Sequence, residues 1–401
     1  MSKKNRKWLV FTIMCLAYMP GSYAQYQLSV YAPELIQSFG LTTSQFSSLF
    51  TAPMIVAIFL SFVGGMISDK VGSKKVINIS FVIAGIGMIG RVFANSYMPF
   101  FLCMALTGFS NMFVNINASK ITASWFEQEK LGILMGIFAF CGQLPGAFAT
   151  ATTAVLFDSR TSAFIVSAIF CISVFVLWLL FVKDKPEDTM EEREKIDQEN
   201  QPSIGDSLKV VLSNKGVWLV SICIMMALGS TVTLSTFMPM ALQTMYGIDM
   251  KVCGTIASML TLGNCIGSIT GPIVFSKIKN VKVFVSGAAV LSFAGIIMCW
   301  RFPSIFVLHI LVLYTGIMLG ASMPIFLSAP VLLEGLGTKY AGSAAGVIST
   351  LQLLGAVLIP TYILTPIAGE NYSLLFMLAS ICMVIMFLCG LLLPQFGNNQ
   401  K

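Results

Sequence analysis

The sequence GGMISDKVGSKKVI at residues 64–77 places Gly, Asp and Lys together between two long apolar stretches. The chain of 401 residues is 56% hydrophobic and only 10% charged, so a cluster of charges is unusual in it. A charged side chain at the centre of a bilayer costs about 2.5–3.5 kcal/mol, which excludes these charges from hydrocarbon. We therefore expect a short loop at a membrane surface, where two membrane spans meet.

The low charge content indicates an integral membrane protein. A soluble domain carries about 25% charged residues, and this chain has too few to cover its surface with polar groups. Apolar runs of about 20 residues, the length that crosses a hydrocarbon core as helix, recur along the chain. Helices are required because a lone strand leaves its backbone unpaired in lipid. The expected spans are 8–31, 45–68, 75–95, 98–120, 131–156, 161–182, 216–240, 252–276, 282–301, 304–329, 340–366 and 372–394.

The basic residues predict the orientation of these twelve spans. Cytoplasmic loops of membrane proteins are enriched in Lys and Arg. If the N-terminus is cytoplasmic, all but four of the 24 basic residues fall on the cytoplasmic side, the exceptions being Arg91, Arg160, Lys251 and Arg301. Both termini are then cytoplasmic. The formal net charge of +7 is explained by this bias and requires no nucleic-acid partner.

The chain divides into two similar halves. A charged stretch at 183–215 separates six expected spans from six, and we interpret it as a cytoplasmic linker between bundles at 1–182 and 216–401. Three segments reappear in the same order: LSVYAP (28–33) as LSTFMP (234–239), GGMISDKVGSKKV (64–76) as GPIVFSKIKNVKV (271–283), and QLPGA (143–147) as QLLGA (352–356). Because the offset is nearly constant, a tandem duplication of a six-helix unit is indicated.

With twelve spans, a duplication and this loop, the chain resembles the major facilitator superfamily of secondary transporters over almost its full length. The resemblance implies an all-α membrane fold of two six-helix bundles related by a pseudo-two-fold axis, which moves a solute by alternating access. It also implies a monomer in the plasma membrane of a bacterium. The family's loop motif is matched by Gly65, Asp69, Lys70, Gly72, Lys74 and Lys75, and Ser73 departs from it where the family prefers Arg.

The resemblance gives this motif a gating role. Asp69 would face the N-terminal end of the eleventh helix, whose partial positive charge favours a carboxylate, and would hold the cytoplasmic side closed. Gly65 and Gly72 would allow close approach or a turn of the backbone. The three lysines are explained equally well as signals that set the topology.

Three amide side chains lie near the middle of their spans: Gln143 in the fifth, Asn264 in the eighth and Gln352 in the eleventh. The duplication makes Gln143 and Gln352 counterparts. A polar side chain at this depth is costly, so we expect these amides to contact the transported solute. The alternative is that each one hydrogen-bonds a neighbouring helix, worth about 0.6 kcal/mol.

Other polar and aromatic residues complete the expected lining. Tyr23 and Tyr26 lie nearer the middle of the first span than Tyr31, and Asn111 and Asn115 share one face of the fourth. Tyr314 in the tenth span is the weakest candidate, since aromatic rings at helical spacing more often serve packing.

Three ionisable residues near span ends could have a charge or proton role. Snorkelling to the interface explains Arg91 and Lys120 at lower cost than binding. His309, the only histidine, could switch its charge near neutral pH or hold a structural hydrogen bond.

Several functions are excluded by what the sequence lacks. There is no GxxxxGK[ST], HExxH or GxSxG motif, and one histidine cannot build a multi-histidine metal site. We expect no enzyme activity, cofactor or metal. The first hypothesis is a symporter, antiporter or facilitator of a small organic solute, with a slight preference for an organic anion such as a carboxylate. An exporter of amphipathic drugs is the alternative within transport, and a transport-inactive membrane sensor is the alternative of another class.

Overall fold

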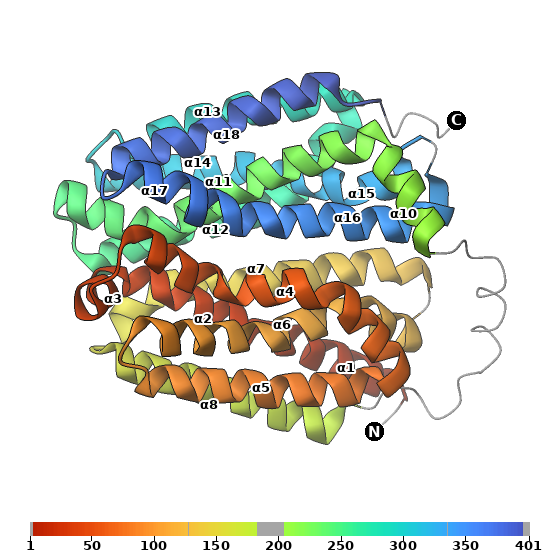
Figure 1. The fold of residues 1–401 in the computed structure, drawn as a ribbon, viewed down its shortest axis with the longest axis horizontal. Coiled ribbons are helices and arrows are strands. Elements are labelled where there is room, and N and C mark those ends of the chain that lie inside the picture. Colours follow the sequence, from red (N-terminus) through yellow and green to blue (C-terminus); the bar gives the residue numbers. More distant parts are fainter. Residues whose placement is uncertain (1–2, 127, 183–203, 335, 396–401) are drawn as a thin grey trace. The chain divides into compact units, whose positions relative to one another are not determined.

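The structure is a computed structural model that describes residues 3–126, 128–182, 204–334 and 336–395. Every regular element in these ranges is a helix, as expected of a chain that crosses lipid (Figure 1). The chain forms two units, one of Met1–Met190 with Asp249–Ser258 and the other of Glu191–Ile248 with Met259–Lys401. Part of the expected linker, 183–203, lies outside the described residues, and its C-terminal part forms helix α10.

Besides the segment Asp249–Ser258, the first unit contains eight helices of the described residues. They are α1 (Lys3–Ala17), α2 (Met19–Val30), α3 (Ala32–Phe39), α4 (Thr43–Val71), α5 (Ser73–Phe93), α6 (Tyr97–Trp125), α7 (Gln128–Leu156) and α8 (Arg160–Phe181). Helix α2 packs against α7, α6 and α8, and α5 packs against α6 and α8. The second half of the first span is therefore surrounded by other helices of its own unit.

The remaining helices follow the same alternation of long helix and short connection. They are α10 (Ile204–Ser213), α11 (Lys215–Tyr246), α12 (Met250–Ile278), α13 (Val281–Met298), α14 (Ile305–Ala321), α15 (Met323–Leu332), α16 (Gly337–Leu358), the π-helix η1 (Ile359–Leu364), α17 (Thr365–Ala368) and α18 (Tyr372–Leu392). Helix α11 packs against α16 and α18, and α13 lies beside α18 (Figure 1).

Eleven segments of the described residues are long and apolar enough to cross a membrane. The count of twelve single helices is not confirmed, because the first expected span is two helices of 15 and 12 residues, each too short to cross alone. Pro20 sits in the first turn of α2, where its missing N–H matters least, and the chain breaks just before it, at Tyr18. The expected span 304–329 is likewise interrupted at Ser322, before Pro324.

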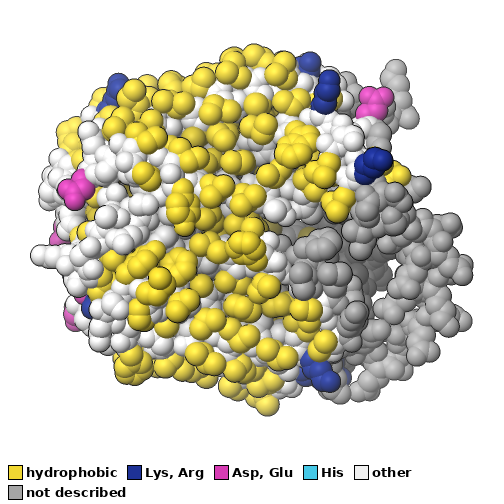
Figure 2. Space-filling model, viewed as in Figure 1, with side chains coloured by type: hydrophobic (Ala, Val, Ile, Leu, Met, Phe, Trp, Pro, Cys, Tyr) yellow, Lys and Arg dark blue, Asp and Glu magenta, His cyan; other side chains and the backbone are white. Residues whose placement is uncertain are grey.

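Large apolar side chains cover the outside of the helices. Phe59 is 73% exposed, Phe93 73% and Phe306 74%. Figure 2 shows hydrophobic side chains over most of the visible face, with the few visible charged ones towards the ends of the helices. Such a surface is stable in contact with acyl chains but not with water, so the chain is an integral membrane protein.

The loop expected at 64–77 is much shorter than the sequence indicated. Helix α4 continues to Val71 and α5 begins at Ser73, so Gly72 alone forms the connection. Its φ of 93° lies in a region that side chains with a Cβ rarely adopt, which explains why a glycine is needed. The side chains of Gly65, Asp69 and Lys70 lie outside the described residues, and their backbone belongs to the last two turns of α4.

Glycines of α7 allow its close approach to the first span. A Cβ built on Gly142 would lie 1.9 Å from the ring of Tyr18, and one on Gly146 would lie 3.0 Å from the ring of Tyr26. The Tyr18 ring cannot easily move away, because it stacks on Phe138 with ring centroids 4.8 Å apart. Small residues at such an interface let two helices pack at short distance in a membrane.

We predict that Gly142→Ala destabilises the detergent-purified protein by about 1–3 kcal/mol and so lowers its thermal unfolding temperature, because the added methyl group overlaps the Tyr18 ring. Gly136→Ala is the matched control on the same helix, where an added Cβ meets no atom within 4 Å. The control should be neutral or stabilising by up to about 1 kcal/mol, since alanine favours helix over glycine. Equal unfolding temperatures of the two variants would show that this contact does not hold α7 to the first span.

Candidate functional site

The break in the first span is stabilised by an amide from another helix. In the orientation that satisfies all its neighbours, the side-chain nitrogen of Asn111 donates to the carbonyl of Tyr18 at 3.1 Å. Its oxygen accepts from the backbone N–H of Ser22 at 3.1 Å and from the Ser22 hydroxyl at 3.0 Å. The first N–H groups of a helix have no partner within the helix. Asn111 of α6 therefore caps α2 from outside.

Tyr26 and Gln143 lie at the same contact between α2 and α7. The Tyr26 ring rests on Gly146, one turn beyond Gln143, and packs edge-on against Phe50 with centroids 5.4 Å apart. Both side chains are half-buried. The two expected lining residues are thus brought together within the first unit.

The second unit has a comparable close contact at its own QLxGA segment. Gly355, three residues after Gln352, packs so closely on α11 that a Cβ there would lie 2.5 Å from the Met225 side chain. The glycine of each QLxGA segment therefore contacts the first long span of its own unit, α2 in one and α11 in the other. Gln352 is half-buried, as is Gln143.

Asn264 lies in a seam of glycines between α12 and α14. Cβ atoms built on Gly316 and Gly320 would lie 2.2 Å from the Leu260 carbonyl and 2.3 Å from the Asn264 carbonyl. This contact fixes the backbone of α12 at Asn264, whose side chain is 7% exposed. The asparagine is thus held on a rigid element.

None of the three mid-span amides has a hydrogen-bond partner among the described residues. This holds for Gln143, Asn264 and Gln352, whereas the buried Gln25 donates to the carbonyl of Phe50 at 2.8 Å and Asn117 to that of Phe113 at 2.8 Å. The alternative explanation, that each amide hydrogen-bonds a neighbouring helix, is therefore not supported by the contacts of the described residues. Their hydrogen-bonding capacity is left for water or a ligand.

The remaining candidates occupy different surroundings. Asn115 is exposed, one turn beyond Asn111. Tyr23 is 8% exposed and borders an apolar groove of about 390 Å³ with Pro145, Phe148 and Phe170. The Tyr314 hydroxyl donates to the carbonyl of Leu291 on α13 at 3.4 Å. Their role in binding stays a prediction.

Arg91 does not snorkel to the interface. It is 1% exposed, and its Nη1 donates to the Ala24 carbonyl at 2.9 Å. Its Nη2 donates to Oε1 of Gln27 at 2.9 Å and to the Ser167 hydroxyl, and the guanidinium lies 4.4 Å from the centroid of the Phe164 ring. The snorkelling interpretation is therefore wrong, because Arg91 lies on the face of α5 that packs against the bundle.

The other ionisable candidates lie at helix ends. Lys120 is exposed on α6, consistent with snorkelling. His309 is half-buried in the first turns of α14, and its Nδ1 lies 2.8 Å from the Ile305 carbonyl. Of the motif lysines, Lys74 is half-buried and Lys75 exposed.

The sequence matches the family model of the Major Facilitator Superfamily over residues 10–360. The chain belongs to the Major Facilitator Superfamily. The resemblance drawn from the loop motif and the duplication is thereby confirmed.

Relatives within the superfamily include transporters of small acids. The chain is 23% identical to the probable sulfoacetate transporter SauU of Cupriavidus necator, covering 85% of this chain and 83% of the relative. It is 22% identical to a galacturonate transporter of Dickeya chrysanthemi, covering 74% and 90%. The membrane sensor protein UhpC of Salmonella typhimurium is 23% identical, covering 88% and 83%.

A solved structure shares the fold. The inward-facing bacterial homologue of the human lysosomal transporter Spinster superposes with a TM-score of 0.76 at 13% identity, covering 98% of this chain and 95% of that one. The family and its transporter relatives point to a transporter rather than an enzyme.

Sequence reasoning missed the polar residues that hold this superfamily member together. Gln27 is fully buried and also donates to the Ala163 carbonyl at 3.2 Å. The spacing of the buried residues of α5, which recur every three or four positions up to Arg91, could have placed Arg91 inside the bundle. Ser167 lies on a similarly spaced buried face of α8, whereas the buried residues of α2 are nearly continuous and give no such signal.

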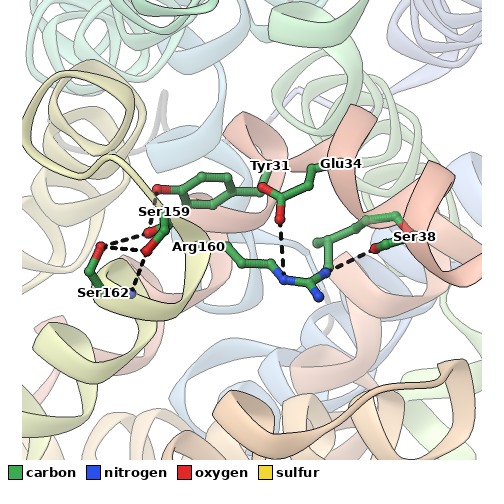
Figure 3. A network of polar contacts seen from close by, with 7 residues as sticks. Tyr31, Glu34, Ser38, Ser159, Arg160 and Ser162 are labelled. Atoms are coloured by element: carbon green, nitrogen blue, oxygen red, sulfur yellow. Dashed lines mark hydrogen bonds and ion pairs between the residues drawn. The ribbon is translucent and has the colours of Figure 1, made fainter.

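A polar cluster ties the end of the first span to the start of α8 (Figure 3). Nε of Arg160 lies 3.3 Å from Oε1 of Glu34, Nη1 donates to the Ser38 hydroxyl at 2.9 Å, and the Tyr31 hydroxyl donates to the Ser159 carbonyl at 3.3 Å. The Glu34 side chain is 50% exposed, so the ion pair itself contributes about 1 kcal/mol at most. The cluster orients α3 rather than forming a binding site.

We predict that Asn111→Ala destabilises the protein by about 1–3 kcal/mol, since it leaves the Tyr18 carbonyl and the Ser22 N–H without their partner. Asn115→Ala on the same helix is the control and should shift stability by less than about 0.5 kcal/mol, because Asn115 is exposed. Thermal unfolding in detergent measures both. A cap at Asn111 is contradicted if the two variants unfold together.

Proposed function

We propose that this protein carries a small organic anion, a carboxylate or sulfonate, across the bacterial plasma membrane by alternating access, with both termini in the cytoplasm. The observation that carries the proposal is the set of three mid-span amides without a protein partner, Gln143, Asn264 and Gln352. Unbonded polar groups are costly in a membrane and mark solute paths. Tyr26 supports the proposal through its place beside Gln143.

The chemistry of these amides suits an oxyanion. Each NH₂ group offers two hydrogen-bond donors, and bonds from such donors to an ionised carboxylate or sulfonate are stronger than bonds between neutral groups. No Asp or Glu lies in the middle of any expected span, so no fixed negative charge repels an anion there. A carbonyl oxygen on the same amide accepts from a hydroxyl group of a sugar acid.

The names of relatives agree with this chemistry. Sulfoacetate and galacturonate, named for two of them, both carry an ionised acid group. Their identities of 23% and 22% support the class of solute rather than one compound.

Asn111 has a smaller part in this proposal than the sequence suggested. Its amide is committed to the backbone of the broken span, so it shapes the site by fixing α2 and Tyr26. Arg91 is committed in the same way to α2 and α8. The solute contacts are therefore assigned to the unbonded amides.

We predict that sulfoacetate or galacturonate raises the unfolding temperature of the purified protein, and that Gln143→Ala and Gln352→Ala each abolish the shift without changing the unliganded stability. A ligand at 100 times its dissociation constant stabilises by about 2.7 kcal/mol, which is easily measured. The neighbouring Leu144→Ala, whose side chain is 37% exposed, should keep the shift. Retained shifts in both glutamine variants would remove these residues from the site.

A sensor function is the second candidate, because the membrane sensor protein UhpC is among the relatives. Uptake of labelled galacturonate and sulfoacetate into proteoliposomes distinguishes a transporter from a sensor. Saturable uptake supports transport, whereas a ligand-induced thermal shift without flux supports sensing. Efflux of a dye without either response would favour the drug exporter.

A further inference from the structure

Arg91 is a buried cation without a counter-charge. It is 1% exposed within a span, and all its hydrogen bonds go to neutral groups of α2, α6 and α8. No carboxylate of the described residues pairs with it, and its Nε has no partner. A buried charge without a partner of opposite charge is costly, and fixing two helices could be done by neutral side chains.

The position of Arg91 relative to α2 is defined by its bonds. The guanidinium contacts α2 at the carbonyl of Ala24 and at the side chain of Gln27. Tyr26 is the neighbour of Gln27, whose side chain meets the guanidinium, and one residue in a helix of about 3.6 residues per turn turns its side chain about 100° around the axis. Tyr26 thus lies around α2 from Arg91, within about one helix diameter, or about 10 Å, of it.

We propose that Arg91 sets the charge preference of the site beside α2: its positive potential favours an anion beside Tyr26 and Gln143 without touching it. This inference rests on the proposed function and deepens it. A unit charge at about 10 Å in a medium of effective dielectric constant about 20 changes the affinity for a monovalent anion about tenfold. In water the same distance would give almost no effect, so the burial of Arg91 is what makes its charge felt.

The chain offers a position at which the charge can be cancelled while the hydrogen bonds of Arg91 stay in place. The sulfur of Met104, fully buried, lies 3.9 Å from Nη1 of Arg91. Glutamate and glutamine are close to methionine in length. Met104→Glu places a carboxylate against the guanidinium, and Met104→Gln places a neutral group of the same shape there.

The experiment compares the affinity of the purified protein for galacturonate and sulfoacetate, by isothermal titration, in the wild type, Met104→Gln and Met104→Glu. We expect Met104→Gln to bind like the wild type and Met104→Glu to bind about ten times more weakly, with both variants folded by thermal unfolding. A merely structural Arg91 would leave the two affinities equal, and that result overturns the inference.

Two further outcomes are informative. If Met104→Glu does not fold, Arg91→Gln takes its place. Its control is Ser167→Ala, which removes one hydrogen bond of Arg91 but keeps the charge. Weaker acid binding in Arg91→Gln alone supports the inference, and equal binding of the two variants overturns it. If the wild type binds neither acid, the proposed function fails and the inference with it. Loss of binding in Gln143→Ala together with equal affinities in the Met104 pair leaves the proposed function standing and removes only the role of Arg91.

Discussion

A helix in a bilayer has to satisfy every backbone polar group without help from water, and the first span of this protein breaks that continuity at Tyr18. The rest of the first unit compensates for the break. Asn111 supplies the hydrogen bonds that the missing turn would have made, and Gly142 leaves room for the Tyr18 ring. Because Asn111 lies on α6 and Gly142 on α7, these contacts fix both helices to the same point of the first span.

The need to satisfy polar groups without water also explains why the three amides without a partner are unusual. Buried polar side chains in this protein usually reach a backbone carbonyl, as Gln25 does at Phe50 and Asn117 does at Phe113. Gln143, Asn264 and Gln352 lie on helices held by glycine contacts, yet reach no described partner. Rigid backbones that carry unsatisfied polar groups are the arrangement expected of a binding site formed before its ligand arrives.

Charge inside the first unit is arranged differently from charge at its rim. Arg160 and Glu34 meet at the exposed end of α8 and neutralise one another, while Arg91 is enclosed by neutral groups. A pair at the rim is screened by water and salt. An enclosed single charge is screened much less. The two arginines thus have different physical roles in one bundle.

The sequence by itself determined the class of the molecule. Long apolar runs, the bias of Lys and Arg, and the repeated LSVYAP, GGMISDK and QLPGA segments were enough to indicate a duplicated helical transporter, because lipid imposes a strong and simple constraint on composition and length. The repeat also paired Gln143 with Gln352, and the structure places Gly146 against α2 and Gly355 against α11. These features depend on the chain's order alone.

Only the tertiary structure decided which polar residues are free. The sequence could not show that Asn111 is used up as a cap, that Arg91 points into the bundle, or that the first span is two helices, since each depends on partners that are distant in the chain. The turn at Gly72 was also shorter than the charges around it suggested. Hydrogen bonds and close packing act between neighbours in space, and the order of residues does not name those neighbours.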